Sequence, residues 1–281
     1  VMPGFWGRLV SLIFFAGLAL DACKSTKDYP GPPDYDFSHP VIVHLPSALD
    51  EISGIVFHPK DTSLFAIQDE KGWLFKIYLR TPVKIEKWKF SNSGDYEDLS
   101  LVDSTFYVLK SKGAIEEFRY YSFDSSDLRS FKVPSEDRNE YETLYYDSQL
   151  KKLVVVCKDC AQDKKGEIST WTFDPATQAY DTGWKIQTDK IRQSLKENKK
   201  IKPSAAAISP MTGELYILAS INKALIILNK DRSFKAAYKI SPTLFPQPEG
   251  ICFTAAGDLI ISNEAADKEQ ADLLIYKFHK S

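Results

Sequence analysis

Five related stretches decide the fold of this chain: Glu51-Ile-Ser-Gly-Ile55, Asp95-Tyr-Glu-Asp-Leu99, Glu140-Tyr-Glu-Thr-Leu144, Lys202-Pro-Ser-Ala-Ala206 and Gln247-Pro-Glu-Gly-Ile251. They begin 44, 45, 62 and 45 residues apart. Such a period indicates one supersecondary unit copied several times, each copy burying its apolar face against its neighbours.

Each copy continues into short runs of β-branched and aromatic residues, such as Leu64–Ile67 and Trp73–Leu79 in the first copy. Runs of this length and composition predict strands, and turn residues such as Thr212-Gly213 separate them. Four strands in about 45 residues are typical of one β-propeller blade. The sequence therefore predicts an all-β protein, a β-propeller of five four-stranded blades, with six blades as the alternative.

Two further segments complete this predicted ring. The last copy contains three strands, and the N-terminal stretch Val41–Leu45 can supply the fourth and close the ring. The 62-residue interval contains an insertion, Gln187–Ile201, in which Thr188 is a candidate N-cap and Ile191 and Leu195 share a face. This spacing predicts a short amphipathic helix, which we expect on the motif-bearing face as a partial lid.

The N-terminal residues 1–22 are predicted to be a lipoprotein signal peptide. Arg8 precedes a twelve-residue apolar run, Leu9–Leu20, which is too short to span a bilayer as a helix. The run ends in Leu20-Asp21-Ala22-Cys23, which resembles a bacterial lipoprotein signal; an ordinary secretory signal is the alternative. We therefore expect lipidation at Cys23 and a lipid-anchored, periplasmic or surface-exposed location in the cell envelope, with the outer membrane favoured.

The proline-rich residues 23–40 predict a semi-extended tether rather than core. Residues 41–281 are then the propeller domain.

Two sets of polar residues are expected to converge at one mouth of the propeller channel. In a propeller the innermost strand opens each blade at one mouth, and the connection after the second strand returns to that mouth. The motifs contribute Ser53, Glu97, Glu142, Ser204 and Glu249, and the ends of the second strands contribute Asp69, Ser111, Lys158, Ser220, Asn263 and Glu264.

Carboxylates crowded at a channel mouth need a cation, a basic partner or raised pKa values. Because hard oxygen ligands suit Ca²⁺ or Mg²⁺, Glu97, Glu142, Glu249 and Glu264 are candidate metal ligands. Ser53, Asp69, Ser204 and Asn263 join them as candidate ligand-binding residues. The alternative interpretation is structural: these side chains accept backbone hydrogen bonds that lock each inner strand to its neighbour.

Several other functions are disfavoured. The net charge of −2 provides no basic excess for nucleic-acid binding. None of the four histidines lies in either polar set, which argues against a His-ligated zinc site or a Ser–His pair at the mouth. The sequence implies no organic cofactor and identifies no catalytic residue.

The cysteines are too few for a disulfide scaffold. Cys157-Lys-Asp-Cys160 ends a predicted strand and is either a local disulfide or two free thiols, whereas Cys252 is expected in the core.

At the five motifs the chain resembles the SdiA-regulated family of bacterial β-propellers, with the Pro-Glu-Gly and Pro-Ser-Ala forms carrying most of the similarity. The resemblance spans about Val41 to Lys280 and implies the propeller fold, but no activity and no catalytic residues. A weaker similarity to phytase-like esterase and calcium-dependent lactonase propellers implies roles beside Ca²⁺ for Glu249, Asn263 and Glu264.

Together these patterns predict an envelope-anchored propeller that binds a small ligand, a divalent cation or a protein partner at its acidic mouth. One alternative is a metal-dependent hydrolase of phosphoesters or lactones at the same mouth. Another is a protein-interaction scaffold, which predicts a large exposed aromatic patch. Whether the protein is an enzyme is left open by the sequence.

Overall fold

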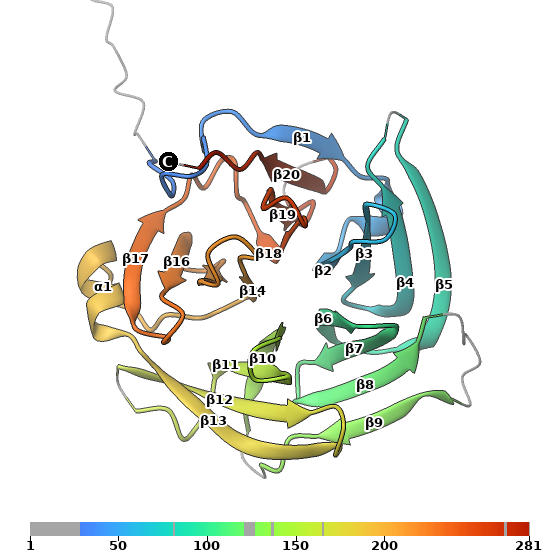
Figure 1. Ribbon diagram of the computed structural model, residues 1–281, viewed down its shortest axis with the longest axis horizontal. Helices are drawn as coiled ribbons and strands as arrows, with labels where there is room; N and C mark the ends of the chain where they lie inside the picture. The colour runs from blue at the N-terminus through green and yellow to red at the C-terminus, as the bar shows by residue number, and fades with distance from the viewer. Residues whose placement is uncertain are drawn as a thin grey trace, which may run out of the picture.

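The computed structural model describes residues 29–80, 82–120, 127–135, 138–164, 166–266 and 269–280. Its strands form five four-stranded antiparallel sheets, arranged as blades around a central channel (Figure 1). The predicted five-bladed propeller is confirmed, and the six-bladed alternative is wrong. The predicted signal peptide and Cys23 lie outside the described residues.

Each repeat unit forms one blade, with its motif on the innermost strand. Blade 1 consists of β2 (Ile52–His58), β3 (Ser63–Gln68), β4 (Lys71–Tyr78) and β5 (Lys84–Ser93). Blade 2 consists of β6 (Tyr96–Val102), β7 (Thr105–Lys110), β8 (Ala114–Arg119) and β9 (Arg129–Lys132). Blade 3 consists of β10 (Glu140–Asp147), β11 (Lys152–Asp159), β12 (Glu167–Asp174) and β13 (Ala179–Gln187). Blade 4 consists of β14 (Ala205–Ile208), β15 (Leu215–Ala219), β16 (Ala224–Leu228) and β17 (Phe234–Lys239).

Blade 5 is shared by the two ends of the chain. It contains β18 (Pro248–Phe253), β19 (Leu259–Asn263), β20 (Asp272–Tyr276) and, as its outermost strand, β1 (Val41–His44). β1 pairs antiparallel with β20, from Val41 opposite Ile275 to His44 opposite Asp272. The predicted closure of the ring by an N-terminal strand is therefore confirmed.

The core lies between the blades. Every residue of β15 and β16 is buried, and their Leu, Ile and Ala side chains pack against neighbouring blades. Each fully buried Leu or Ile side chain contributes about 1.5–3 kcal/mol. Cys252 is buried, as predicted.

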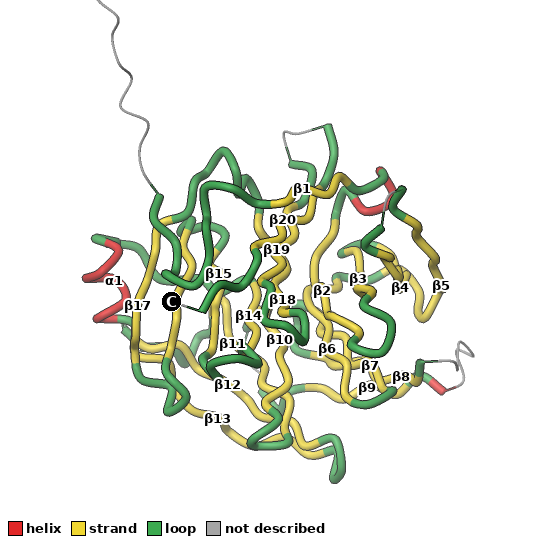
Figure 2. The backbone as a smooth tube through the Cα atoms, turned by 45° about the horizontal axis from the view of Figure 1, so that its top comes forward, coloured by secondary structure: helices red, strands yellow, loops and turns green. Residues whose placement is uncertain are grey.

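The inner strands lie side by side along the channel (Figure 2). The ends of the channel differ in character. The C-terminal halves of the inner strands line a largely apolar opening, including Leu101, Ile208 and Phe253. The motif-bearing N-terminal ends line a polar one.

Residues before β1 correct the predicted tether. Phe37 is buried and stacks on Tyr276 with ring centroids 4.4 Å apart. Tyr35 is also buried, and its hydroxyl donates a hydrogen bond to the Gly257 carbonyl oxygen (2.8 Å). The prolines correctly suggest an irregular chain, but these two aromatic side chains bury enough apolar area to hold it against blades 4 and 5.

The predicted helix in the insertion is present as α1 (Asp189–Leu195), and Ile191 and Leu195 are buried as expected. It packs against β17, the outermost strand of blade 4, at the periphery of the ring (Figure 1). The expectation of a lid over the mouth is wrong because the helix buries its apolar face against the outside of this blade. A short 3-10 helix, η1 (Ser47–Leu49), precedes β2. None of the helices described is long and apolar enough to span a bilayer.

Candidate functional site

β-Bulges aim the motif side chains into the channel mouth. On β6, Tyr96 pairs with Lys110 and Asp98 pairs with Leu109, so Glu97 is an extra residue without a partner. Glu142 on β10 and Glu249 on β18 are extra residues in the same way. A bulge redirects the side chain it carries, which explains why the third motif position reaches the channel.

Backbone hydrogen bonds bring the second polar set to the same rim. The amides of Asp69, Ser111 and Glu264, which follow the second strands, donate to the carbonyl oxygens of the first motif residues Glu51, Asp95 and Gln247 (3.2, 3.0 and 3.0 Å). Further bonds reach the next blade, as from the Tyr96 amide to the Asp69 carbonyl oxygen (2.8 Å). The rim is thus held by main-chain contacts within and between blades.

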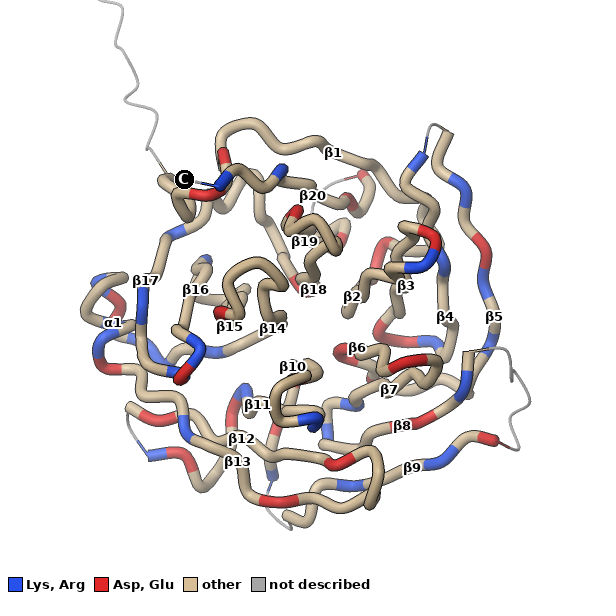
Figure 3. The backbone as a smooth tube through the Cα atoms, in the orientation of Figure 1, with Lys and Arg blue, Asp and Glu red and all other residues tan. Residues whose placement is uncertain are grey.

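These residues enclose a cavity of about 490 Å³ at the mouth. Acidic positions lie on and beside the inner strands that surround it (Figure 3). The lining contains six of the eight predicted ligand-binding residues, Ser53, Asp69, Glu97, Glu142, Glu249 and Glu264. Lys158 and Ser220 also line it, so most of the two polar sets converge.

The other two predicted residues, Ser204 and Asn263, do not line the cavity. The Ser204 hydroxyl donates to the Pro248 carbonyl oxygen (3.1 Å) and links blade 4 to blade 5. The Asn263 side-chain amide donates to Asp272 Oδ1 (2.7 Å) within blade 5. The Ser204 hydroxyl also accepts a hydrogen bond from the Ser220 amide (3.3 Å), which fits the structural interpretation, whereas the Asn263 bond joins β19 to β20 within one blade and locks no inner strand.

The fourth residue of the second motif, Asp98, is also structural. Its carboxylate is buried and accepts hydrogen bonds from the amides of Leu99 and Leu144, both at 2.8 Å. Because Leu144 lies on β10, this carboxylate joins blade 2 to blade 3.

Besides Lys158 and Ser220, five lining residues are not among the predicted ligand-binding residues: Asp95, Ile221, Lys223, Pro246 and Gln247. Asp95 and Gln247 occupy the first motif position, which repeats through the chain. Ile221 and Lys223 lie in the turn between β15 and β16. Their position directly after a second strand is the sequence feature that could have identified them as lining residues. Ile221 is 58% exposed and gives the otherwise polar mouth an apolar rim.

Four carboxyl groups of the mouth have raised pKa values. Burial, and then the negative charges of neighbouring carboxylates, raise the pKa of Glu97 and of Glu264 to about 8. Burial likewise raises the pKa of Glu249 to about 7 and that of Asp69 to about 6. At neutral pH this site therefore retains protons that ordinary carboxyl groups would have lost.

The two basic groups of the cavity have defined partners. Lys158 forms an ion pair with Glu142, and its charge opposes the rise in the pKa of Glu97 and Glu249. Lys223 donates to the Pro246 carbonyl oxygen, and burial lowers its pKa.

Two polar atoms of the lining are buried without a hydrogen-bond partner among the described residues: Ser53 Oγ and Asp69 Oδ1. Ser53 is only 3% exposed. Buried polar atoms are normally paired, so these two are available to a ligand.

The described carboxylates do not form a compact metal site at the mouth. No three of them place one oxygen each within 4.8 Å of one another. The group that meets this spacing is Cys157, Cys160 and Asp163, but its two cysteines form a disulfide. Of the two predicted states of the cysteine pair, the structure contains the disulfide.

The exposed large hydrophobic side chains in the described ranges include no aromatic residue; they are Val41, Ile42, Leu150, Met211 and Ile221. The aromatic patch expected of an interaction scaffold is therefore missing from this part of the chain.

Comparisons with known proteins agree with the fold. A family model described as SdiA-regulated matches residues 33–267. No curated protein matches the sequence significantly. Among solved structures, glutaminyl cyclase from Myxococcus xanthus is similar with 14% identity and a TM-score of 0.55, covering 85% of this chain and 96% of that one. A luciferin-regenerating enzyme has 11% identity and a TM-score of 0.52, with coverage of 85% and 95%. These structural similarities concern the fold alone.

Proposed function

The chain belongs to the SdiA-regulated family, and we propose that it binds a small, positively charged ligand in the acidic cavity at its channel mouth. The observation that carries this proposal is the charge imbalance of the lining. Six carboxyl groups, Asp69, Asp95, Glu97, Glu142, Glu249 and Glu264, face only two amino groups, Lys158 and Lys223.

Burial raises the pKa values of Glu97, Glu249 and Glu264, and repulsion from neighbouring carboxylates adds to the rise for Glu97 and Glu264. Without a cation, the mouth lowers its negative charge by keeping protons on Glu97, Glu249 and Glu264. A bound cation would take over this role, so binding releases protons and strengthens as pH rises. The unpaired Ser53 Oγ and Asp69 Oδ1 supply additional oxygen ligands or acceptors.

The shape of the cavity limits the type of cation. About 490 Å³ is much more than one ion needs, since about 10–15 Å³ of such space is enough to hold one water molecule. It accommodates hydrated Ca²⁺ or Mg²⁺, or an organic amine whose carbon atoms contact Ile221. A hydrated metal ion would be held through its water shell by Glu97, Glu249 and Glu264, because no three described carboxylates of the mouth lie close enough to ligate one ion together and Glu142 already pairs with Lys158.

Isothermal titration calorimetry at pH 6.0 and 8.5 with CaCl₂, MgCl₂ and putrescine tests the proposal and distinguishes a divalent metal ion from an organic amine as the ligand. We expect saturable binding of at least one probe, tighter at pH 8.5. Glu97→Gln should weaken it by about tenfold, or about 1.4 kcal/mol. Glu167→Gln, which removes the same charge on β12 away from the cavity, is the matched control. Absence of binding by all three probes at pH 8.5 would refute the proposal.

The metal-dependent hydrolase remains a second candidate because of one observation. A pKa of about 7 for Glu249 and about 8 for Glu97 lies where a carboxyl group can both donate and accept a proton near neutral pH. Hydrolysis of an aryl phosphate and an aliphatic lactone, with and without Ca²⁺, tests it. Activity that survives Glu249→Gln and Glu97→Gln would rule out this site.

We also propose that the protein is held at the cell envelope by a lipid on Cys23, on the basis of the Leu20–Cys23 signal. Metabolic labelling with an alkynyl fatty acid should mark the wild-type protein and not Cys23→Ser, and the variant should leave the membrane fraction. Equal labelling of both would argue against the anchor.

A further inference from the structure

A second bulge distinguishes blade 3 from the other blades. Glu140 pairs with Asp159 and Tyr141 pairs with Cys157, so Lys158 on β11 has no partner opposite it. The second strands β3, β7, β15 and β19 show no such extra residue opposite their inner strands. The bulge aims Lys158 into the mouth, where it meets Glu142.

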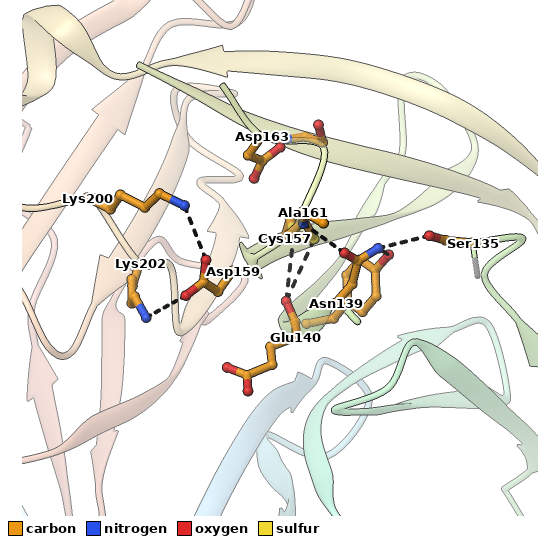
Figure 4. The surroundings of a disulfide bond; sticks show 12 residues. Ser135, Asn139, Glu140, Cys157, Asp159, Ala161, Asp163, Lys200 and Lys202 are labelled. Atoms are coloured by element: carbon orange, nitrogen blue, oxygen red, sulfur yellow. Dashed lines mark hydrogen bonds and ion pairs between the residues drawn. A yellow bond between two sulfur atoms is a disulfide. The ribbon is translucent and has the colours of Figure 1, made fainter. Parts of the chain in front are cut away.

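The disulfide between Cys157 and Cys160 spans this bulge. Asp159, the other residue inside the loop, pairs with Lys200 (3.2 Å) and Lys202 (2.9 Å) from the segment that follows α1 (Figure 4). The disulfide-closed segment 157–160 therefore holds Lys158 at the mouth and Asp159 against the segment that follows α1.

A separate cavity of about 300 Å³ reaches the disulfide. Asp159, Cys160 and Ala161 line it together with two basic residues, Arg138 and Lys200, and two further acidic ones, Glu140 and Asp163. The charge of Lys200 is paired with Asp159, so Arg138 is the basic group of this lining that favours an approaching thiolate. The Glu140 carbonyl oxygen lies 3.7 Å from Cys157 Sγ and 4.0 Å from Cys160 Sγ, so it can accept a hydrogen bond from a thiol formed there (Figure 4).

We propose that the Cys157–Cys160 disulfide is a reversible thiol-modification site, and that its reduction by a dithiol releases Lys158 from the mouth and tightens binding of the cationic ligand. The ligand part of this inference rests on the proposed function. Loss of the covalent loop allows the bulge to relax, and the departing ammonium group leaves Glu142 and its neighbours available to a cation.

The chemistry balances with a dithiol as the reductant. One thiolate of the dithiol attacks Cys160 Sγ, the bond between the two cysteines breaks, and Cys157 leaves as a thiolate that takes up a proton. The second thiolate of the dithiol then attacks the dithiol's first sulfur, which is bonded to Cys160 in the mixed disulfide. Cys160 leaves as a thiolate and is protonated in turn. The dithiol ends as a cyclic disulfide, and the protein has gained two electrons and two protons.

The test compares oxidised protein with protein reduced by dithiothreitol, which is then removed under argon. Alkylation and mass spectrometry establish the state of the cysteine pair in the folded protein. Calorimetry at pH 8.5 with CaCl₂ and with putrescine should show binding at least about fivefold tighter after reduction, within the usual range of coupling between sites. Lys158→Gln should bind as tightly as the reduced protein and should no longer respond to reduction.

A second readout needs no ligand. Carboxyl ¹³C NMR titration should show the pKa values of Glu97 and Glu249 rising on reduction, because Lys158 opposes their rise when it is in place. If the pKa values rise but neither probe binds, the proposed function fails and control of Lys158 by the disulfide stands.

Unchanged pKa values and unchanged affinity after verified reduction would overturn the inference. So would a disulfide that dithiothreitol cannot reduce in the folded protein. Cys157→Ser/Cys160→Ser should match the reduced state; if it does not fold, the wild-type comparison decides alone.

Discussion

Arg232, in the turn between β16 and β17, donates to the buried carboxylate of Asp147 at the end of β10 and joins blade 4 to blade 3. Asp147 Oδ1 also accepts hydrogen bonds from the amides of Gln149 (3.0 Å) and Leu150 (3.1 Å). One side chain thus ends a strand, shapes the following turn and fixes the neighbouring blade.

Asp147→Asn should lower the free energy of unfolding by about 2–4 kcal/mol, because it leaves the Arg232 guanidinium without its counter-charge. Urea denaturation measures the change. Asp181→Asn, which breaks the exposed pair with Lys152, should cost less than about 1 kcal/mol. Equal effects of the two substitutions would mean that the blade contact does not contribute.

Lys76 carries a charge in a nearly closed environment. It is 4% exposed, forms an ion pair with Asp61 and donates to the Tyr120 hydroxyl (2.8 Å). Its ammonium nitrogen lies 5.2–5.3 Å from the ring centroids of Tyr78, Phe65 and Tyr120. Burial disfavours both charges, but hydrogen bonds with Asp61 and Tyr120 raise the pKa of Lys76, and hydrogen bonds with His58, Lys76 and Ser63 lower that of Asp61.

Asp61→Asn should therefore destabilise the protein more than Lys76→Met, by about 3 against about 1 kcal/mol, because only the first leaves a buried charge unpaired. Since folding lowers the pKa of Asp61, its contribution is present above about pH 4 and disappears as the pH falls further. Urea denaturation at pH 7 and pH 3 measures both effects. A larger loss for Lys76→Met would contradict this account.

The acidic mouth should make stability fall as pH rises. Folding raises the pKa of Glu264 from 4.5 to about 8, so the folded state holds more protons than the unfolded state across this interval, and the free energy of unfolding decreases from about pH 4.5 to 8. Glu264→Gln should flatten the profile and be about 1–2 kcal/mol more stable than wild type at pH 8.5. Denaturation at several pH values, without added cations, checks this; profiles of equal slope would count against it.

Phe37→Ala should destabilise the propeller by about 2–4 kcal/mol, since it leaves a cavity beside Tyr276. His39→Ala, at a position where the side chain is exposed, is the matched control and should have little effect. Thermal denaturation compares the two. Similar melting temperatures would mean that this segment is a tether after all.

Much of the site was predictable because its residues repeat. The third motif position correctly places Glu97, Glu142 and Glu249 at the channel mouth, since each occupies the same bulge in its own blade. The third motif position does not predict a lining residue at Ser204. Here β14 begins only at Ala205, and its pairing with β15 has no bulge that would turn the Ser204 side chain into the channel.

Other features depend on contacts that sequence periodicity does not encode. The position of Lys223 follows from a turn in which its φ is 47°. The helix α1 was predicted, but its place beside β17 is decided by which blade can bury Ile191 and Leu195. Tyr35 and Phe37 cannot be recognised as core residues from the sequence because the prolines around them dominate the composition of that segment.

The pairing of β1 with β20 sets an order of events during biosynthesis. β1 is among the first strands to be made, yet its partner lies more than 200 residues later in the chain. Until β20 emerges, β1 has no partner in its own sheet, and an unpaired strand edge is an aggregation hazard. Val41 and Ile42 are exposed even in the finished ring, so this edge needs protection until β20 has been synthesised.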